Sequence, residues 1–342
     1  MKILLLGFFS TVGDLEVLEV LTIWLKKRNY SYDIAAYDKA ENNAIEGAID
    51  IYTLNPSEYT HLVIVCGPFW SNTFIKKRIN LNHFSHCVTI GFNLSIIESL
   101  EKYNPFDYLM IRDYNEFHKP DASFLCVKPK IPVFGICLTP KQNEYKEKQQ
   151  HESADKLFFN LITKNNFAAI KINTQWPISN NGTWINSPEA FESVCCRLDV
   201  MLTTRLHGMV LALKSGIPVI AIDPIRGGAK VKNQGKAIGW PYVFCIDEIN
   251  EELLIKTAKS CLLPESRELA KECGERAKAS LENMQNEFYF SLHDIPVKKS
   301  KPILLFPETT IVIENKSSIW TYIYNRIINK LISFLKKLLI SN

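Results

Sequence analysis

The stretch that decides the fold is DVMLTTRLHGMVLALKSGIPVIAIDP, residues 199–224. Residues 200–202 form a short apolar run and residues 219–222 a fully apolar one, which is typical of strands buried on both faces of a sheet. Between them, residues 207–214 place apolar side chains on one arc of a helix. Gly216 ends that helix, because glycine adopts the left-handed conformation without strain. The stretch therefore predicts one β-α-β unit.

Two basic side chains lie at the start of the predicted helix. Arg205 and His207 come just beyond the carboxyl end of the first strand. In open α/β sheets, ligands bind at the carboxyl ends of the strands. A helix N-terminus adds unpaired N–H donors and the positive end of the helix dipole, which suit an anion. Arg205 and His207 are therefore the first candidates for a site that binds an anionic substrate.

The rest of the chain repeats this alternation of strands and helices on both sides of a proline-punctuated crossing. The alternation predicts an α/β protein with parallel, doubly wound sheets. We expect an N-terminal Rossmann-like domain over residues 1–130 and a second Rossmann-like domain over residues 131–290. A linker over residues 291–316 and a helix over residues 317–342 are expected to follow.

Composition narrows the function classes. With 46% hydrophobic and 22% charged residues, the chain has the composition of a globular protein. The net charge of +4 is too small for the usual nucleic-acid-binding domain. The nine cysteines include no C-x-x-C pair, which favours a reducing compartment and no structural metal. The first apolar run is too short for a signal peptide, and we expect a cytoplasmic protein without a spanning helix.

One run of the sequence is distinctive: Thr204-Arg205-Leu206-His207-Gly208, followed by Ala212, Gly216 and Pro218. It closely resembles the signature of the polysaccharide pyruvyl transferases, and weaker similarities extend over most of residues 1–285. The resemblance implies a glycosyltransferase-B-like architecture, in which two doubly wound domains face each other across a cleft. It also implies transfer of pyruvate from phosphoenolpyruvate to two hydroxyls of a sugar, as a cyclic ketal, with release of phosphate. Phosphoenolpyruvate would be a co-substrate, and no other cofactor is expected.

The resemblance assigns the donor site to the second domain. Phosphoenolpyruvate carries a carboxylate and a phosphate, and its methylene carbon must be protonated by a general acid before a sugar hydroxyl attacks. His207 is the candidate acid. Arg205 offers a planar fork for the carboxylate or the phosphate. Thr204 and Gly208, from the same run, are expected to contribute to substrate binding.

A basic, glycine-containing stretch, residues 222–236, follows the next predicted strand. We expect it to be a loop that binds the donor. The family carries a lysine after its equivalent strand. Lys230 matches that position best, and Lys232 is the alternative. Arg226 and Lys236 are the other cations of the stretch. The alternative is a solvated basic loop with no ligand.

The resemblance places the acceptor sugar against the first domain. Gly13 and Asp14, in a predicted loop before a helix over residues 15–27, resemble a Gly-Asp pair that follows the family's first strand. Asp14 could bind a sugar hydroxyl or act as a base, and the alternative is that it caps the helix. Arg112 resembles the arginine of a family Arg-Asp pair and is expected to bind substrate, although Glu116 stands where the family has serine.

Two other functions stay open. One is a nucleotide-sugar-dependent glycosyltransferase of the same architecture. Many such enzymes place two glutamates eight positions apart ahead of their Gly-x-Pro, whereas this chain has Thr203 and Leu211 there. That difference disfavours a nucleotide donor. The other is a non-catalytic sugar-binding protein at the membrane surface, which the intact pair of Arg205 and His207 disfavours.

The C-terminal residues 317–342 show the pattern of a basic amphipathic helix. Trp320 and a series of isoleucines and leucines share one face, and Lys330, Lys336 and other polar residues share the opposite face. Such a helix lies in a membrane interface, so we expect peripheral attachment to the cytoplasmic face of the inner membrane, where a lipid-linked glycan acceptor would be found. The alternative is that its apolar face packs on the protein or on a second copy of the chain.

Overall fold

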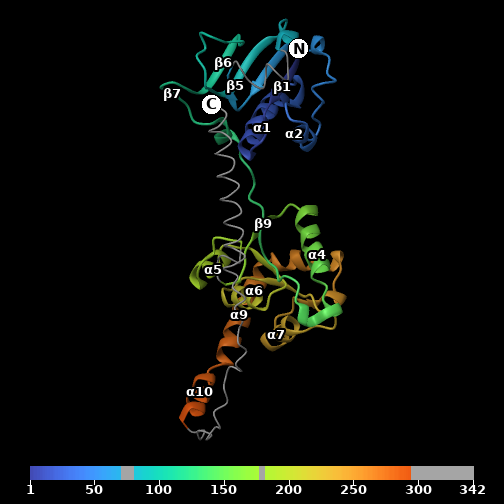
Figure 1. Ribbon diagram of the computed structural model, residues 1–342, viewed down its shortest axis with the longest axis vertical. Coiled ribbons are helices and arrows are strands. Elements are labelled where there is room, and N and C mark those ends of the chain that lie inside the picture. Colours follow the sequence, from blue (N-terminus) through green and yellow to red (C-terminus); the bar gives the residue numbers. More distant parts are fainter. Residues whose placement is uncertain (71–80, 177–181, 294–342) are drawn as a thin grey trace, which may run out of the picture. The chain divides into compact units, whose positions relative to one another are not determined.

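The computed structural model describes residues 1–70, 81–176 and 182–293. The chain divides into two compact units, residues 1–131 and residues 132–342 (Figure 1). The predicted helix over residues 317–342 and all but the first residues of the predicted linker lie outside the described part of the chain. No helix in that described part has the length and hydropathy needed to cross a membrane.

The first unit is built on a mainly parallel sheet, and the described residues of this unit include the α-helices α1 (Val12–Lys27) and α2 (Lys39–Ala44). Its five main strands, in the order β2-β1-β3-β5-β6, are β1 (Lys2–Gly7), β2 (Ser31–Ala36), β3 (His61–Val65), β5 (Val88–Ile96) and β6 (Tyr108–Tyr114). Two short strands complete the sheet: β4 (Pro68–Phe69) pairs with β5, and β7 (Phe117–His118) pairs antiparallel with β6. Single 3₁₀ turns occur at η1 (Pro56–Glu58), η2 (Leu81–Phe84) and η3 (Ala122–Leu125).

β1, an interior strand of this sheet, is apolar on both faces. Ile3 and Leu5 of β1 pack with residues of α1 such as Leu18, whereas Leu4 and Leu6 pack on the opposite face. Because successive side chains of a strand point to opposite faces, a continuous apolar run is what a strand covered on both sides requires.

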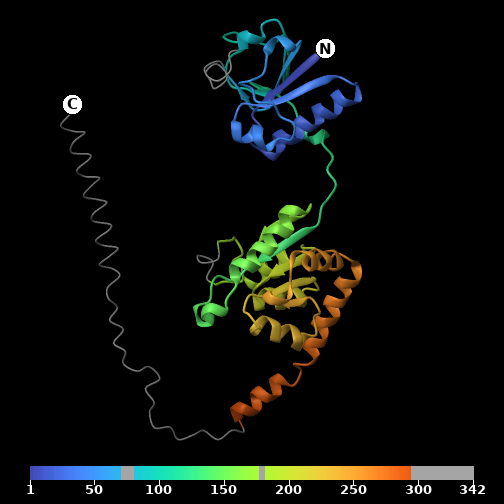
Figure 2. The ribbon, with the colours of Figure 1, turned by 90° about the vertical axis from the view of Figure 1, so that its right-hand side faces the viewer.

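The second unit has a fully parallel sheet in the order β12-β11-β10-β8-β9, with helices on both faces (Figure 2). Its strands are β8 (Val133–Cys137), β9 (Ala168–Lys171), β10 (Val200–Thr203), β11 (Val219–Asp223) and β12 (Val243–Cys245). Its α-helices are α4 (His151–Lys164), α5 (Pro188–Cys195), α6 (Leu206–Lys214), α7 (Lys230–Ile238), α8 (Glu251–Cys261), α9 (Pro264–Ala279) and α10 (Met284–His293). Two 3₁₀ segments, η4 (Asn143–Lys148) and η6 (Ile246–Glu248), precede α4 and α8.

Both units place their main strands in the same order. Numbered by occurrence within each unit, the five strands run 2-1-3-4-5 across the sheet. The strand order reverses between the first and third strands, and ligands bind at the carboxyl ends beside such a point. The predicted class, two Rossmann-like α/β domains, is therefore confirmed for each unit. That the two units face each other across a cleft stays a prediction.

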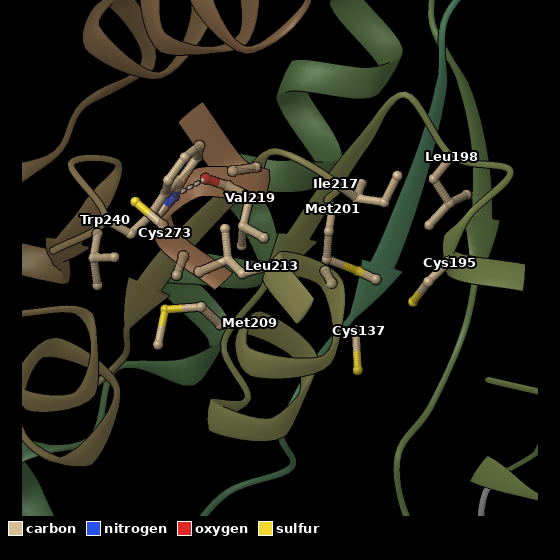
Figure 3. Close-up of a cluster of buried hydrophobic side chains, with 14 of the residues drawn as sticks. Cys137, Cys195, Leu198, Met201, Met209, Leu213, Ile217, Val219, Trp240 and Cys273 are labelled. Carbon is tan, nitrogen blue, oxygen red and sulfur yellow. Dashed lines mark hydrogen bonds between the residues drawn. The ribbon is translucent and has the colours of Figure 1, made fainter. Parts of the chain in front are cut away.

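The core of the second unit lies on both faces of its sheet. On one face, Met201 of β10 and Val219 of β11 pack with Met209 and Leu213 of α6 (Figure 3). The indole N–H of Trp240 donates a hydrogen bond of 2.8 Å to the carbonyl of Val219, so its polar atom is paired within the core. The other face is covered by α4 and α8. The predicted β-α-β unit is therefore the centre of this unit.

Two element boundaries correct the sequence prediction. α1 begins at Val12, so Gly13 and Asp14 lie in its first turn and not in a loop. α7 begins at Lys230, so the basic stretch is a loop only as far as Ala229 and is helical beyond it.

Candidate functional site

The turn between β10 and α6 is held to the loop that follows β8. The Thr203 hydroxyl donates a hydrogen bond of 2.7 Å to the carbonyl of Cys137 and accepts one of 2.9 Å from the backbone N–H of Arg205. The Thr204 hydroxyl accepts a bond of 2.8 Å from the N–H of Thr139. These bonds place Arg205 and the start of α6 beside β8, at the point where the strand order reverses. Thr204 is buried, and its hydroxyl has this structural partner instead of an open position.

Arg205 is the residue that precedes the first turn of α6, with extended backbone angles of φ −102° and ψ 134°. Its side chain is half-buried, and its Nε donates a bond of 2.6 Å to the carbonyl of Leu138. Its two terminal nitrogens have no hydrogen-bond partner among the described residues. One nitrogen therefore orients the guanidinium, and the other two are available to a planar anion.

The start of α6 offers further donors. The backbone N–H groups of Leu206, His207 and Gly208 belong to the first turn, where a helix provides no acceptor, and no side chain caps this end. The His207 side chain is exposed and has no hydrogen bond to any part of the chain that the structure describes. The arrangement can bind an anion through N–H donors and place an imidazole beside it.

The close packing of α6 against β8 and β10 requires a glycine at position 208. It is buried, and a Cβ there would lie 3.1 Å from the Sγ of Cys137 and closer still to the Thr203 hydroxyl oxygen. The absence of a side chain lets α6 approach β8 and β10 closely. The predicted contribution of Gly208 to substrate binding is therefore limited to its backbone N–H.

Asp223 organises the loop after β11, a role that the sequence reasoning missed. Its buried carboxylate accepts three backbone N–H bonds, from Ile225 at 3.2 Å, Ala229 at 2.7 Å and Lys232 at 2.9 Å. The carboxylate thus closes the loop and caps α7. The sequence feature that could have indicated this role is the acidic residue itself, which ends an otherwise apolar strand.

The structure separates the two candidate lysines. The Lys232 ammonium donates to the Val243 carbonyl at 3.1 Å and to the Glu248 carboxylate at 2.5 Å. This bond to Lys232 lowers the pKa of Glu248. Lys230, the first residue of α7, is exposed and has no ion pair within the described ranges. Lys230 is therefore free to meet a ligand, whereas Lys232 is committed to the fold.

The two remaining cations of the basic stretch lie on the surface. Arg226 is exposed, and its Nε is 3.9 Å from the carboxylate of Asp247. Lys236 lies in the last turn of α7 and is exposed. Neither is oriented by short hydrogen bonds of its side chain, so the geometry does not single them out as ligand contacts.

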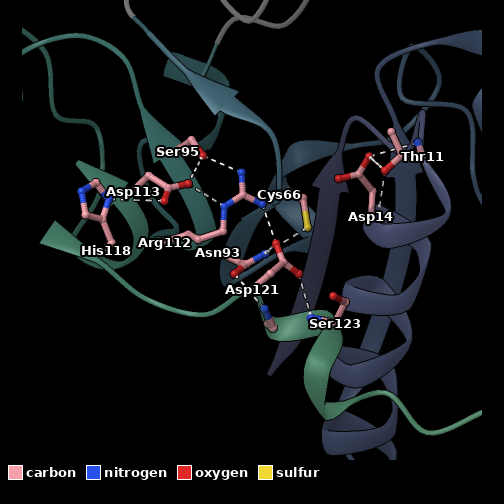
Figure 4. A network of polar contacts seen from close by, with 11 residues as sticks. Thr11, Asp14, Cys66, Asn93, Ser95, Arg112, Asp113, His118, Asp121 and Ser123 are labelled. Carbon is pink, nitrogen blue, oxygen red and sulfur yellow. Dashed lines mark hydrogen bonds and ion pairs between the residues drawn. The ribbon is translucent and has the colours of Figure 1, made fainter. Parts of the chain in front are cut away.

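In the first unit, Arg112 is enclosed by protein partners (Figure 4). Its guanidinium donates to Asp113 at 2.8 Å, to Asp121 at 2.5 Å and to the Ser95 hydroxyl at 2.5 Å. Burial raises the pKa of Asp121, but bonds from the Ser123 N–H, from Asn93 and from Arg112 outweigh burial and hold that pKa at about 2. Each nitrogen of the guanidinium thus already has a partner, and direct binding of substrate by Arg112 stays a prediction.

Asp14 takes the alternative role that the sequence left open. Its carboxylate accepts bonds from the backbone N–H and the hydroxyl of Thr11, at 3.1 Å and 2.7 Å, while the Asp14 N–H donates to the Thr11 hydroxyl (Figure 4). This reciprocal pair is a capping box. Gly13 lies between them in the helical first turn. The structure therefore shows both residues in the start of α1, and a catalytic role for Asp14 or a binding role for Gly13 stays a prediction.

No set of three or more histidine, cysteine or acidic side chains suited to a metal ion occurs within residues 1–70, 81–176 and 182–293. The cysteines in these ranges are free, and most are buried.

The chain was compared with known proteins. Residues 99–225 match the family model of the polysaccharide pyruvyl transferases. The matched segment includes Arg112 and the whole run from Thr204 to Gly208, so the resemblance predicted from the sequence is confirmed there. Among curated proteins, none matches the chain.

Solved structures with a related fold include glycosyltransferases and an epimerase. The spinosyn rhamnosyltransferase SpnG complexed with thymidine diphosphate is 10% identical, with 84% of this chain and 100% of that chain covered and a TM-score of 0.32. A putative UDP-N-acetylglucosamine 2-epimerase from Listeria monocytogenes is 13% identical, with 84% and 97% covered and a TM-score of 0.29. MurG from Acinetobacter baumannii is 8% identical, with 83% and 99% covered and a TM-score of 0.29. These similarities concern the fold alone.

Proposed function

We propose that this chain is a ketal pyruvyl transferase, which moves pyruvate from phosphoenolpyruvate onto two hydroxyls of a sugar in a surface polysaccharide or its lipid-linked precursor. The observation that carries the proposal is the pairing of Arg205 and His207 at the start of α6. Both residues lie in the segment that matches the family model. Both also lie where the strand order of the second sheet reverses.

The groups at this edge suit the charges of phosphoenolpyruvate. The two unpaired nitrogens of Arg205 match the spacing of a carboxylate or of two phosphoryl oxygens. The unpaired N–H groups of α6 favour an anion at its N-terminus. Lys230, at the start of α7 after the neighbouring strand β11, has no ion pair among the described residues, and we assign it to the donor site in preference to Lys232.

His207 supplies the proton in this proposal. The methylene carbon of phosphoenolpyruvate takes that proton and becomes a methyl group, which makes the adjacent carbon electrophilic. One sugar hydroxyl attacks that carbon, phosphate leaves, and a second hydroxyl closes the ketal. Of the two hydroxyl protons, one returns His207 to its protonated form and the other leaves with phosphate. The negative charge of the bound donor stabilises the imidazolium that starts the reaction.

Nothing at the corresponding positions supports a nucleotide-sugar donor. The carboxylates that many nucleotide-sugar enzymes carry would align with Thr203 and Leu211. Thr203 is fully buried and bonded to β8, and Leu211 packs against the core beneath α6. Neither position offers a carboxylate to a ribose.

The experiment compares donors on the full chain. Millimolar phosphoenolpyruvate is expected to raise the melting temperature, and UDP- and TDP-sugars are not. With a glycan acceptor in deuterated water, the product methyl group should carry one deuterium and one phosphate should be released per ketal. Stabilisation by a nucleotide sugar but not by phosphoenolpyruvate would show that the proposal is wrong.

The place of the reaction is part of the proposal. A lipid-linked acceptor would bring the enzyme to the cytoplasmic face of the membrane, and the basic pattern of residues 317–342 supports attachment there. Those residues lie outside the described part of the chain. The full chain should bind anionic vesicles more weakly as salt is added, and a chain truncated after Asn315 should not bind. Loss of folding or of a dimer on truncation would instead assign this segment to a protein contact.

A further inference from the structure

A pocket lies at the start of α4, apart from the residues of the proposed donor site. Its volume is about 230 Å³, and it is lined by Lys141, Gln149, Gln150, His151, Glu152 and Ser153. A water molecule occupies about 30 Å³ in the liquid, so the pocket has room for a small polyatomic ion. The family resemblance assigned no role to any of these residues.

His151 is a buried side chain. It is 3% exposed, and neither ring nitrogen has a hydrogen-bond partner among the residues that the structure describes. Buried polar groups are nearly always hydrogen-bonded, because an unpaired one loses its hydration without compensation. Because His151 also lines a pocket, a ligand in that pocket would supply a partner for one of its two ring nitrogens.

The start of α4 adds backbone donors to the same pocket. The helix has 14 residues, and no side chain caps its first turn. The N–H of Ala154 is bonded to the carbonyl of Gln150, whereas those of His151, Glu152 and Ser153 precede the first intrahelical bond and have no acceptor among the described residues. These donors and the helix dipole favour an anion.

The charges around His151 come from β11, η4, α7 and the segment before η4. Burial lowers its pKa, the carboxylates of Asp223 and Glu144 act in the opposite sense, and Lys230 and Lys141 lower it further. The imidazole is therefore neutral at pH 7 and offers one N–H donor and one acceptor nitrogen. Asp223 is occupied by its three backbone bonds, and Lys141 pairs at 2.6 Å with Glu152 at the rim.

We propose that this pocket is an oxyanion site of the phosphate class. In it, the N–H groups of the first turn of α4 and one ring nitrogen of His151 bind phosphoryl oxygens. Lys141, whose ion pair with Glu152 is exposed to solvent, exchanges that partner for the anion. The pocket lies at the same edge of the sheet as Arg205, because Gln150 donates a bond of 2.7 Å to the carbonyl of Pro224, just after β11. The proposal does not depend on the identity of the donor.

The test follows the histidine ring signals of the full chain by NMR while inorganic phosphate is added. The His151 signal, assigned with His151→Asn, should shift saturably. His151→Phe should weaken phosphate binding by about tenfold or more, since it removes a hydrogen bond to a charged group. The matched control is His293→Phe, at the exposed end of α10, which should bind phosphate as the unmodified chain does.

Two sources of the phosphoryl group are distinguished in a parallel titration. A shift of the His151 signal by phosphoenolpyruvate at lower concentration than by phosphate identifies a donor subsite, and a shift by phosphate alone identifies the site of the released product.

The proposal is overturned if the His151 signal does not move, or if His207→Gln abolishes phosphate binding while His151→Phe does not. If His151→Phe fails to fold, the proposal is tested by two other results: the shift of the His151 signal in the unmodified chain, and weaker phosphate binding by Lys141→Met. A chain that binds phosphate here but does not use phosphoenolpyruvate would contradict only the proposed function.

Discussion

The Nε atom of Arg205 donates a hydrogen bond of 2.6 Å to the carbonyl oxygen of Leu138. The bond joins the turn after β10 to the loop after β8, across the point where the strand order reverses. A lysine here would keep the positive charge. Its ammonium group lacks the planar fork of a guanidinium, which donates to the carbonyl with one nitrogen and faces an anion with the other two.

Arg205→Lys is therefore expected to leave the fold intact and to weaken phosphoenolpyruvate binding by about ten- to a hundredfold, which corresponds to the loss of a charge-assisted pair of bonds. Calorimetric titration of the full chain measures the affinity. Arg276→Lys, on α9, is the control and should bind normally. Unchanged affinity in the Arg205 variant would place this residue outside the anion site.

His207→Gln keeps a polar side chain at the start of α6 but cannot transfer a proton. Turnover should fall by about 10²- to 10⁴-fold, the range typical of a lost general acid, while donor affinity changes much less. The measurement is phosphate release together with deuterium incorporation into the methyl group. His293→Gln serves as the control. Turnover close to that of the unmodified chain would remove His207 from the mechanism.

Gly208→Ala tests the close approach of α6 to the sheet. The added Cβ would meet the Thr203 hydroxyl and the Sγ of Cys137, so the variant should lose about 1–3 kcal/mol of stability. Gly13→Ala is the matched control, because the nearest atom to a Cβ there is 3.7 Å away and the residue is already helical. Differential scanning calorimetry compares the two. Equal melting temperatures for both variants would contradict the packing argument.

Lys230 and Lys232 are expected to have different roles, one in donor binding and the other in stability. Lys232→Met removes the bonds to Glu248 and to the Val243 carbonyl, and is expected to lower stability by about 1 kcal/mol with little effect on donor binding. Lys230→Met should leave stability unchanged and weaken donor binding by about three- to tenfold. Thermal unfolding and calorimetric titration of both variants check this. The opposite pattern would assign the donor contact to Lys232.

The Arg112 network should make stability depend on acid pH. Because the pKa of Asp121 is held at about 2, below its ordinary value of 3.8, its contribution is present above about pH 4 and is lost as the pH falls toward 2. This contribution is at most about 2 kcal/mol. The melting-temperature difference between the unmodified chain and Asp121→Asn should therefore shrink from pH 5 to pH 2. A difference that stays constant over this window would mean that Asp121 does not titrate with the depressed pKa.

Much of the second unit could be predicted from residues 199–224 alone. Strands buried on both faces must be apolar, and the helix between them must end at a residue that tolerates positive φ, as Gly216 does at +68°. The positions of Arg205 and His207 at the edge of the sheet follow from this local pattern, because the carboxyl end of a strand and the start of the next helix are adjacent in sequence.

The partners of the site residues could not be predicted in this way. Leu138 is 67 positions from Arg205, and only the pairing of β8 with β10 brings them together. The same holds for Arg112 and Ser95, whose contact depends on the register of β5 and β6, including the left-handed conformation of Asn93. Periodicity shows which face of an element is buried, but it does not show which distant group a buried side chain meets.

The amino-acid sequence by itself therefore determined the two α/β units, the central β-α-β unit and the location of one basic pair, since each depends on residues close together in the chain. For the part of the chain that the structure describes, the tertiary structure alone decided three things: Lys232 has an ion pair while Lys230 has none, Arg112 is bonded to two aspartates and a serine, and His151 is buried without a hydrogen-bond partner. Each of these depends on which strands lie side by side, because hydrogen bonds and ion pairs are made between elements that the sequence keeps far apart.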